Sequence, residues 1–157
     1  MRTVLLSVVL LFATLAAKAQ SLTMKDIKGN WKMVAFDMSG IYYEWGIDSL
    51  ALSAELKQEV TPGTEAAVVA DIKRRLNEYT DGYLKISDNL YVQKLMGEEL
   101  DGSYTLIQKG SNQYLRVVNN NTNKDVDEIK VQKKRGWLYI SMPADDGSET
   151  VLIFEKD

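Results

Sequence analysis

The feature that most constrains the fold is a regular succession of short segments with alternating apolar and polar residues, separated by turn-forming residues. Alternation with a period of two predicts strands that bury one face. Turn-forming pairs such as Asp88-Asn89, Gly110-Ser111 and Arg135-Gly136 interrupt the alternation. The predicted strands are residues 30–38, 41–45, 83–87, 90–96, 102–109, 113–118, 127–134, 136–142 and 149–156. Strands about 8–12 residues apart are typical of a β-sandwich or a β-barrel.

One stretch near the start departs from this pattern and predicts two helices. From Asp48 to about Val60, apolar residues recur at the four-residue spacing of a helix. Pro62 then suits the first turn of a second helix, which ends near Tyr79. We therefore expect a helical insertion at about residues 48–80, with its apolar stripes covering one end of the sheet structure.

A barrel explains the succession of hairpins better than a sandwich. A meander of antiparallel strands closes most simply into an up-and-down barrel, which leaves no exposed edge strand. The chain has 157 residues, enough for one such domain. We predict a mainly β fold: an antiparallel up-and-down β-barrel of about eight or nine strands, with a two-helix insertion after the first strand.

The N-terminus has the pattern of an export signal. Met1 and Arg2 form a short positive end, residues 3–17 are almost entirely apolar, and Ala17-Lys18-Ala19 matches the small-x-small cleavage pattern. The alternative, a membrane anchor, needs about 20 apolar residues, more than this run provides. We expect a signal peptide at residues 1–19 and a mature barrel domain at residues 20–157. That domain would be periplasmic or extracellular and soluble, without stable membrane insertion.

Composition argues against several classes of function. The net charge of −3 gives no basic surface for nucleic acid. The sequence contains no Cys and no His, so it has no thiol nucleophile, disulfide, or Ser-His-Asp triad, and it lacks the commonest metal ligand. We therefore expect no metal, no cofactor and no catalytic activity.

Gly29 and Trp31, at the start of the first predicted strand, carry a resemblance to a known group. They resemble the Gly-x-Trp signature of lipocalins and their relatives, the calycin group. The resemblance implies that Trp31 packs across the closed end of a barrel. Helices directly after the first strand resemble the arrangement of fatty-acid-binding proteins. That family usually has an Arg-x-Tyr clamp for carboxylates on its last strand, where this chain has Leu152 and Phe154.

Most of the predicted mature chain resembles exported lipocalin-like domain proteins of Bacteroidetes-type bacteria. The resemblance implies a non-catalytic protein that binds a small amphipathic or hydrophobic molecule inside the barrel. The alternative is a filled barrel that acts as a protein-interaction or inhibitor module in the cell envelope. A third hypothesis is an isomerase or hydrolase that uses Tyr and carboxylates at a barrel mouth.

Aromatic residues on the strands are the candidates for ligand binding. If their face points inward, they provide an aromatic lining with phenolic hydroxyls and one guanidinium as polar groups. The alternatives are an outer face, or packing within a filled core. The candidate residues are Tyr83, Tyr104, Tyr114, Arg116, Trp137 and Tyr139.

Acidic residues offer weaker candidates. Glu98 and Glu99 are adjacent in a predicted turn, so a role in solubility is expected rather than glycoside chemistry. Asp125, Asp127 and Glu128 lie near an Asn-rich loop, but their spacing lacks the ordered pattern of a calcium-binding loop.

Overall fold

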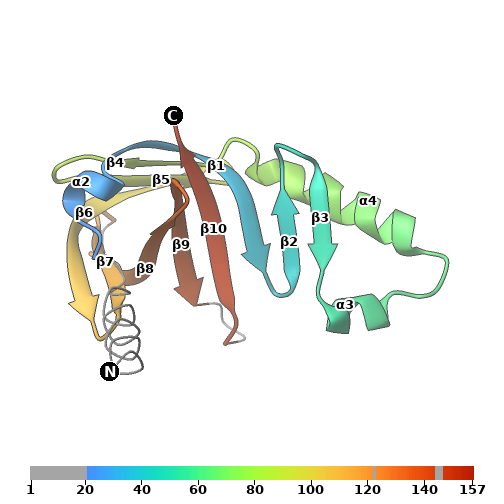
Figure 1. Cartoon of the computed structure of the whole chain (residues 1–157). Coiled ribbons are helices and arrows are strands. Elements are labelled where there is room, and N and C mark those ends of the chain that lie inside the picture. The colour runs from blue at the N-terminus through green and yellow to red at the C-terminus, as the bar shows by residue number, and fades with distance from the viewer. Residues whose placement is uncertain (1–20, 122, 144–146) are drawn as a thin grey trace, which may run out of the picture.

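The structure is a computed structural model that describes residues 21–121, 123–143 and 147–157. The predicted signal peptide lies outside the described residues. Ten strands form one antiparallel sheet in the order β10-β9-β8-β7-β6-β5-β4-β1-β2-β3, and pairing of β10 with β1 closes eight of them into a barrel (Figure 1). The prediction of a mainly β fold with an antiparallel barrel is therefore confirmed.

The elements have the following bounds. The strands are β1 Gly29–Met38, β2 Ile41–Glu44, β3 Ser49–Leu52, β4 Tyr83–Ile86, β5 Tyr91–Leu95, β6 Glu98–Lys109, β7 Asn112–Asn119, β8 Val126–Lys134, β9 Trp137–Pro143 and β10 Glu149–Lys156. The helices are α2 Met24–Ile27, α3 Ala54–Glu59, α4 Glu65–Leu76 and the 3-10 helix η1 Asn77–Tyr79. No helix within the described ranges combines the length and the hydropathy needed to cross a membrane.

Two long strands, β1 and β6, each pair with different strands along their length, which allows the sheet to close. The first half of β1 pairs with β4 and its second half with β2, while β10 runs along both halves. The register of β1 against β10 shifts between Met33 and Ala35, which marks a β-bulge near that change of partner. Along β6 the partner changes from β5 to β7 at Gly102. A Cβ atom there would lie 2.5 Å from the carbonyl oxygen of Val118, so only glycine fits this corner.

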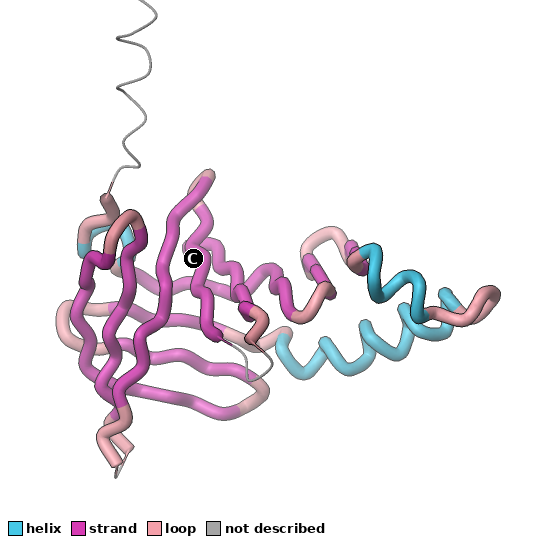
Figure 2. The backbone as a smooth tube through the Cα atoms, turned by 90° about the horizontal axis from the view of Figure 1, so that it is seen from below, coloured by secondary structure: helices cyan, strands magenta, loops and turns pink. Residues whose placement is uncertain are grey.

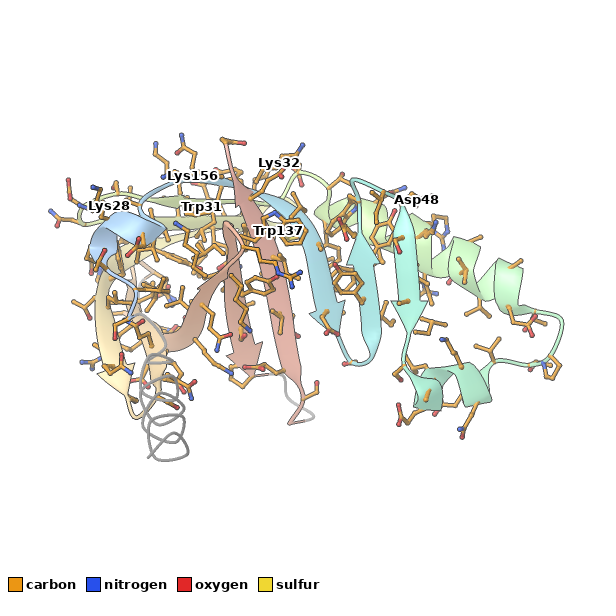
Figure 3. The ribbon with its side chains drawn as sticks, in the orientation of Figure 1. Lys28, Trp31, Lys32, Asp48, Trp137 and Lys156 are labelled. Carbon is orange, nitrogen blue, oxygen red and sulfur yellow. The ribbon has the colours of Figure 1, made fainter. Side chains whose placement is uncertain are left out.

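Helix α2 closes one end of the barrel. Its Ile27 is fully buried, and the carbonyl of Ile27 accepts a hydrogen bond of 2.7 Å from the Trp31 indole. Thr23 and Asp26 form a capping box that starts the short helix. The segment before it is held by Gln113, whose side-chain amide donates to the carbonyl of Leu22 and accepts from its N–H. Figure 3 shows Trp31 beside α2 at this end.

The barrel interior next to the closed end is filled by apolar side chains. Inward positions alternate with outward ones along the barrel strands, apart from the bulge in β1, as the sequence pattern predicts. The fully buried side chains include Trp31, Leu84, Ile86, Tyr91, Leu115, Val117, Val131, Leu138, Ile140 and Phe154. This packing supplies the hydrophobic stabilisation of a chain that has no disulfide.

The predicted helix from Asp48 to Val60 is wrong in its first half. Residues 49–52 form β3, which pairs with β2 so that Leu50 lies opposite Tyr43 and Leu52 opposite Ile41. These leucines are two residues apart, so they share one face of a strand, and pairing with β2 determines the outcome. Only residues 54–59 of that stretch are helical.

The helices do not cover an end of the barrel, contrary to expectation. Figures 1 and 2 show α3 and α4 beside the β2–β3 hairpin, extending away from the barrel. At the hairpin turn, the carboxylate of Asp48 forms an ion pair of 2.7 Å with Lys73 on α4 (Figure 3). Asp48 also accepts a hydrogen bond from the Tyr43 hydroxyl, and the Tyr79 ring stacks on Phe36 at 5.9 Å. The hairpin and α4 thus form a small second layer attached to β1.

Candidate functional site

The end of the barrel opposite α2 contains an open cavity of about 530 Å³. It lies where β5 turns into β6, where β8 begins and where β9 ends. Its apolar lining consists of Leu95, Leu100, Val126, Ile129, Met142 and Pro143, and its polar lining of Gln93, Glu98, Glu99, Asp127 and Glu128. Cavities of a few hundred Å³ with apolar walls and a few polar groups are typical of sites for small molecules. We call this cavity the barrel mouth.

The floor of the mouth carries polar side chains in place of the apolar filling below it. Gln93 lines the mouth although it is only 5% exposed, and its amide oxygen accepts a hydrogen bond from the hydroxyl of Tyr91. The amide nitrogen of Gln93 has no hydrogen-bond partner among the described residues. Burial and the nearby charge of Asp127 raise the pKa of Tyr91, so this hydroxyl keeps its proton at neutral pH.

A second buried amide lies beside the mouth. Asn119 is 3% exposed, and its amide nitrogen donates a hydrogen bond of 2.7 Å to the carboxylate of Asp127. Its amide oxygen is buried and has no partner in the part of the chain that the structure describes. Unpaired buried polar atoms are rare because each costs about 1–3 kcal/mol. Gln93 is therefore the buried amide that lines the mouth, and Asn119 is a second one behind Asp127.

Strand register determines which acidic side chains face into the mouth. Directly paired residues lie on the same face of a sheet. Glu98 pairs with Leu95, two positions from the inward Gln93, and Asp127 pairs with the fully buried Val117. Glu98 and Asp127 therefore point inward.

The neighbouring acids point outward and have partners there. Glu99 pairs with Lys94 across the sheet and accepts a hydrogen bond from the Tyr83 hydroxyl. Glu128 forms an ion pair with Lys109. Neither Glu98 nor Asp127 has an ion pair with a described Lys or Arg, so the inward carboxylates lack a cation that the outward Glu128 has.

The aromatic residues proposed from the sequence lie mainly on the outside. Tyr114 and Arg116 alternate with the buried Leu115 and Val117, so they point outward. Of the two orientations left open by the sequence, the outer face is therefore correct for this pair. Neither residue lines the mouth.

Trp137 and Tyr139 on β9 are also outward, because they alternate with the buried Leu138 and Ile140. Tyr139 lies in a shallow outer groove, with the Lys134 ammonium 5.4 Å from its ring centroid. Since both rings are outside, the barrel has no aromatic lining at these positions.

Tyr83 and Tyr104 complete the set. Tyr83 is outward and holds Glu99 at the rim of the mouth. Tyr104 is the one candidate that points inward; it is 7% exposed, and its hydroxyl donates a hydrogen bond of 2.6 Å to the carbonyl of Ser87. This hydroxyl is used inside the fold, so Tyr104 acts as a core residue.

Gly29 and Trp31 lie at the closed end, far from the mouth. The ammonium groups of Lys133 and Lys156 lie 5.7 and 5.6 Å from the Trp31 ring centroid. Gly29 has φ +141°, and a Cβ atom there would lie 2.8 Å from Cε of Lys156. The Gly-x-Trp pair thus has a structural role in sealing the barrel.

Sequence reasoning missed Gln93 in the mouth and Asn119 beside it, and it considered Glu98 and Asp127 only as weak candidates for other chemistry. A signal was present, since Gln93 and Asn119 stand at alternating positions otherwise occupied by core residues. A polar residue at such a position is expensive unless it has a partner or a ligand. Glu98 was expected in a turn and instead begins β6.

Comparison with known proteins gives little about function. No family model matches the chain, and no curated protein matches it. Among the solved structures that match is that of a DUF4847 family protein from Bacteroides vulgatus, with a TM-score of 0.47 at 12% identity. The match covers 86% of this chain and 98% of that protein, and nothing about function follows from it.

The described residues contain no group of three or more acidic side chains placed to hold a metal ion. Asp125, Asp127 and Glu128 therefore do not converge, and the side chain of Asp125 instead accepts a hydrogen bond from Asn121.

Proposed function

We propose that this chain is an exported, lipocalin-like binding protein that holds a small amphipathic molecule in the mouth of its barrel. The observation that carries the proposal is the change of the barrel interior from a filled apolar core to an open cavity with a polar floor. Apolar walls suit the body of such a ligand, and the amide of Gln93 suits a polar group.

Binding is proposed rather than catalysis because the polar groups of the floor are poorly placed for proton transfer. The Tyr91 ring is fully buried and its hydroxyl is bonded to Gln93. Its raised pKa makes it a poor base at neutral pH. The carboxylate of Asp127 is held by Asn119 rather than by a group that shuttles protons.

The alternative function is a protein-interaction module in the cell envelope. The observation in its favour is the second layer, in which α3 has no buried residue and α4 buries only Leu76 (Figure 2). Helices with so little burial present most of their surface to the surroundings. In that case the mouth would bind nothing, and the experiment below separates the two functions.

The test is binding of N-phenyl-1-naphthylamine, a neutral amphipathic probe whose fluorescence rises in apolar surroundings. The wild-type chain is compared with Leu100→Trp, which adds bulk to the inward wall of the mouth. The matched control is Thr105→Trp, on the outward face of the same strand. We expect saturable binding by wild type and Thr105→Trp, and at least about tenfold weaker binding by Leu100→Trp. Absence of binding by wild type, or equal binding by the two variants, would overturn the proposal.

A further inference from the structure

We propose that the molecule bound in the mouth is an organic cation: a protonated amine, quaternary ammonium or guanidinium group on an apolar body. The inference rests on the proposed function and specifies the chemical class of its ligand. It follows from the charge of the cavity lining and from the buried amide of Gln93 that lines the cavity.

The lining of the mouth is acidic and lacks positive side chains. Its carboxylates are those of the inward Glu98 and Asp127 and, at the rim, of the outward Glu99 and Glu128, and none of the lining residues is Lys or Arg. The inward and outward carboxylates differ in their partners. The outward Glu128 has Lys109 and the outward Glu99 has Tyr83, whereas the inward Glu98 and Asp127 have no ion pair with any described residue. A cation in the mouth would supply the missing counter-charge.

Carboxylates at a rim can be satisfied by water, so the acidic lining alone does not identify a ligand. The independent observation is Gln93, which is 95% buried, lines the cavity and leaves one end of its amide without a partner in the described chain. Asn119 likewise leaves a buried acceptor next to Asp127. Burial of such groups is costly unless a bound molecule or water completes their hydrogen bonds.

The acceptors outnumber the donors at this site. The carboxylates of Glu98 and Asp127 accept hydrogen bonds, and the amide nitrogen of Gln93 donates. A positively charged ligand matches this set, and the N–H groups of an amine or guanidinium would add hydrogen bonds, whereas a carboxylate or phosphate meets repulsion from two acids. This agrees with the absence of an Arg-x-Tyr clamp on β10, where Leu152 and Phe154 are buried.

The apolar walls decide between an organic cation and a bare metal ion. Leu95, Leu100, Ile129 and Met142 surround the polar floor, and such side chains offer nothing to a hydrated metal. They pack well against an alkyl or aryl body. No acidic cluster suited to a metal is found in the residues that the structure describes.

The experiment is displacement of N-phenyl-1-naphthylamine by two amphiphiles with the same chain length and opposite charge. Dodecyltrimethylammonium and dodecyl sulfate are titrated below their critical micelle concentrations at low ionic strength. We expect the cation to displace the probe at a concentration about tenfold lower or more. The preference should shrink as sodium chloride is raised, because salt screens exposed charges.

Variants locate the preference within the site. In the double variant Glu98→Gln, Asp127→Asn, the preference for the cation should fall to within about threefold, while probe binding is retained. Asn at position 127 can still accept the hydrogen bond from Asn119, so the fold is preserved. The matched control, Glu99→Gln with Glu128→Gln, removes the same number of charges from outward positions and should keep most of the preference.

The outcomes distinguish this inference from the proposed function. If the probe binds but cation and anion displace it equally, the mouth binds amphiphiles and the cation inference is wrong. If the outward double variant loses the preference and the inward one keeps it, the inference is also wrong. If the wild-type chain binds no probe at all, the proposed function itself fails.

Discussion

The three tryptophans of this chain occupy three different environments, which give three different expected costs of replacement by phenylalanine. Trp31 is fully buried, and its indole N–H bonds to the carbonyl of the fully buried Ile27. Trp31→Phe leaves that carbonyl unpaired, at a cost of about 1–3 kcal/mol. The lost part of the indole is comparable to one or two methylene groups, about 1–2 kcal/mol more. We expect a total loss of about 2–5 kcal/mol, a large part of the ~5–15 kcal/mol stability of a typical domain.

The other two replacements serve as controls with the same chemistry. Trp137 is outward and half-buried, so Trp137→Phe should cost less than about 1 kcal/mol. The indole nitrogen of Trp45 is buried without a partner in the described residues. Trp45→Phe removes this unsatisfied donor, which offsets the lost packing, so its effect should lie within about 1 kcal/mol of zero.

Urea unfolding followed by far-ultraviolet circular dichroism measures all three effects, because this signal does not depend on tryptophan fluorescence. The midpoint should fall clearly for Trp31→Phe with an unchanged m-value, which reports a change in stability rather than in compactness. If Trp31→Phe and Trp137→Phe lose equal stability, the assignment of Trp31 as the anchor of the closed end is refuted.

Two further predictions concern the corner of β6 at Gly102 and the ion pair of Asp48 beside α4. Gly102→Ala should lower the free energy of unfolding in urea by about 1–3 kcal/mol, because its Cβ would lie 2.5 Å from the Val118 carbonyl oxygen. The control Gly46→Ala, whose Cβ would have no atom within 4 Å, should be near neutral. Equal effects of the two variants would contradict the corner assigned to β6. Hydrogen bonds to Asp48 lower the pKa of its carboxyl group, and the hydrogen bond from Lys73 has the largest effect. The carboxylate of Asp48 therefore stabilises the fold above the unfolded carboxyl pKa of about 3.9, and this stabilisation is lost as pH falls through the lower pKa of the folded state. Stability curves of wild type and Asp48→Asn should therefore differ at neutral pH and converge in acid; a constant difference would show that the ion pair is not responsible.

The sequence predicted the barrel well because strand alternation and turn residues are local signals. It could not determine which face of each strand points inward, since a period of two fits either face. On β9 the inward residues are Leu138 and Ile140, whose side chains are entirely apolar, while Trp137 and Tyr139 keep their polar atoms outside. The aromatic lining expected from the sequence therefore became an outer surface.

The stretch after Asp48 shows a second limit. Leu52 and Leu56 fit the spacing of a helix, and Leu50 and Leu52 fit that of a strand. Pairing of Leu50 with Tyr43 on β2 decides in favour of a strand. This contact is tertiary, and no local rule contains it.

The mouth could be predicted least of all. Glu98 and Asp127 come from β6 and β8, and closure of the barrel places them at one opening. Their importance depends on register, because a shift by one residue would turn both outward. What the sequence does contain is Gln93, a polar residue within the predicted strand 90–96 at a position where alternation predicts a core residue, whereas Asn119 lies just beyond the predicted strand 113–118.

The most direct test of the account is native mass spectrometry of the protein purified gently from its own host, together with Leu100→Trp prepared in the same way. We predict that wild type carries an adduct of small-molecule mass that is lost on denaturation, and that Leu100→Trp carries none. A bare mass for wild type in every preparation, unchanged after addition of dodecyltrimethylammonium or N-phenyl-1-naphthylamine, would contradict a binding role for the mouth and favour the interaction module.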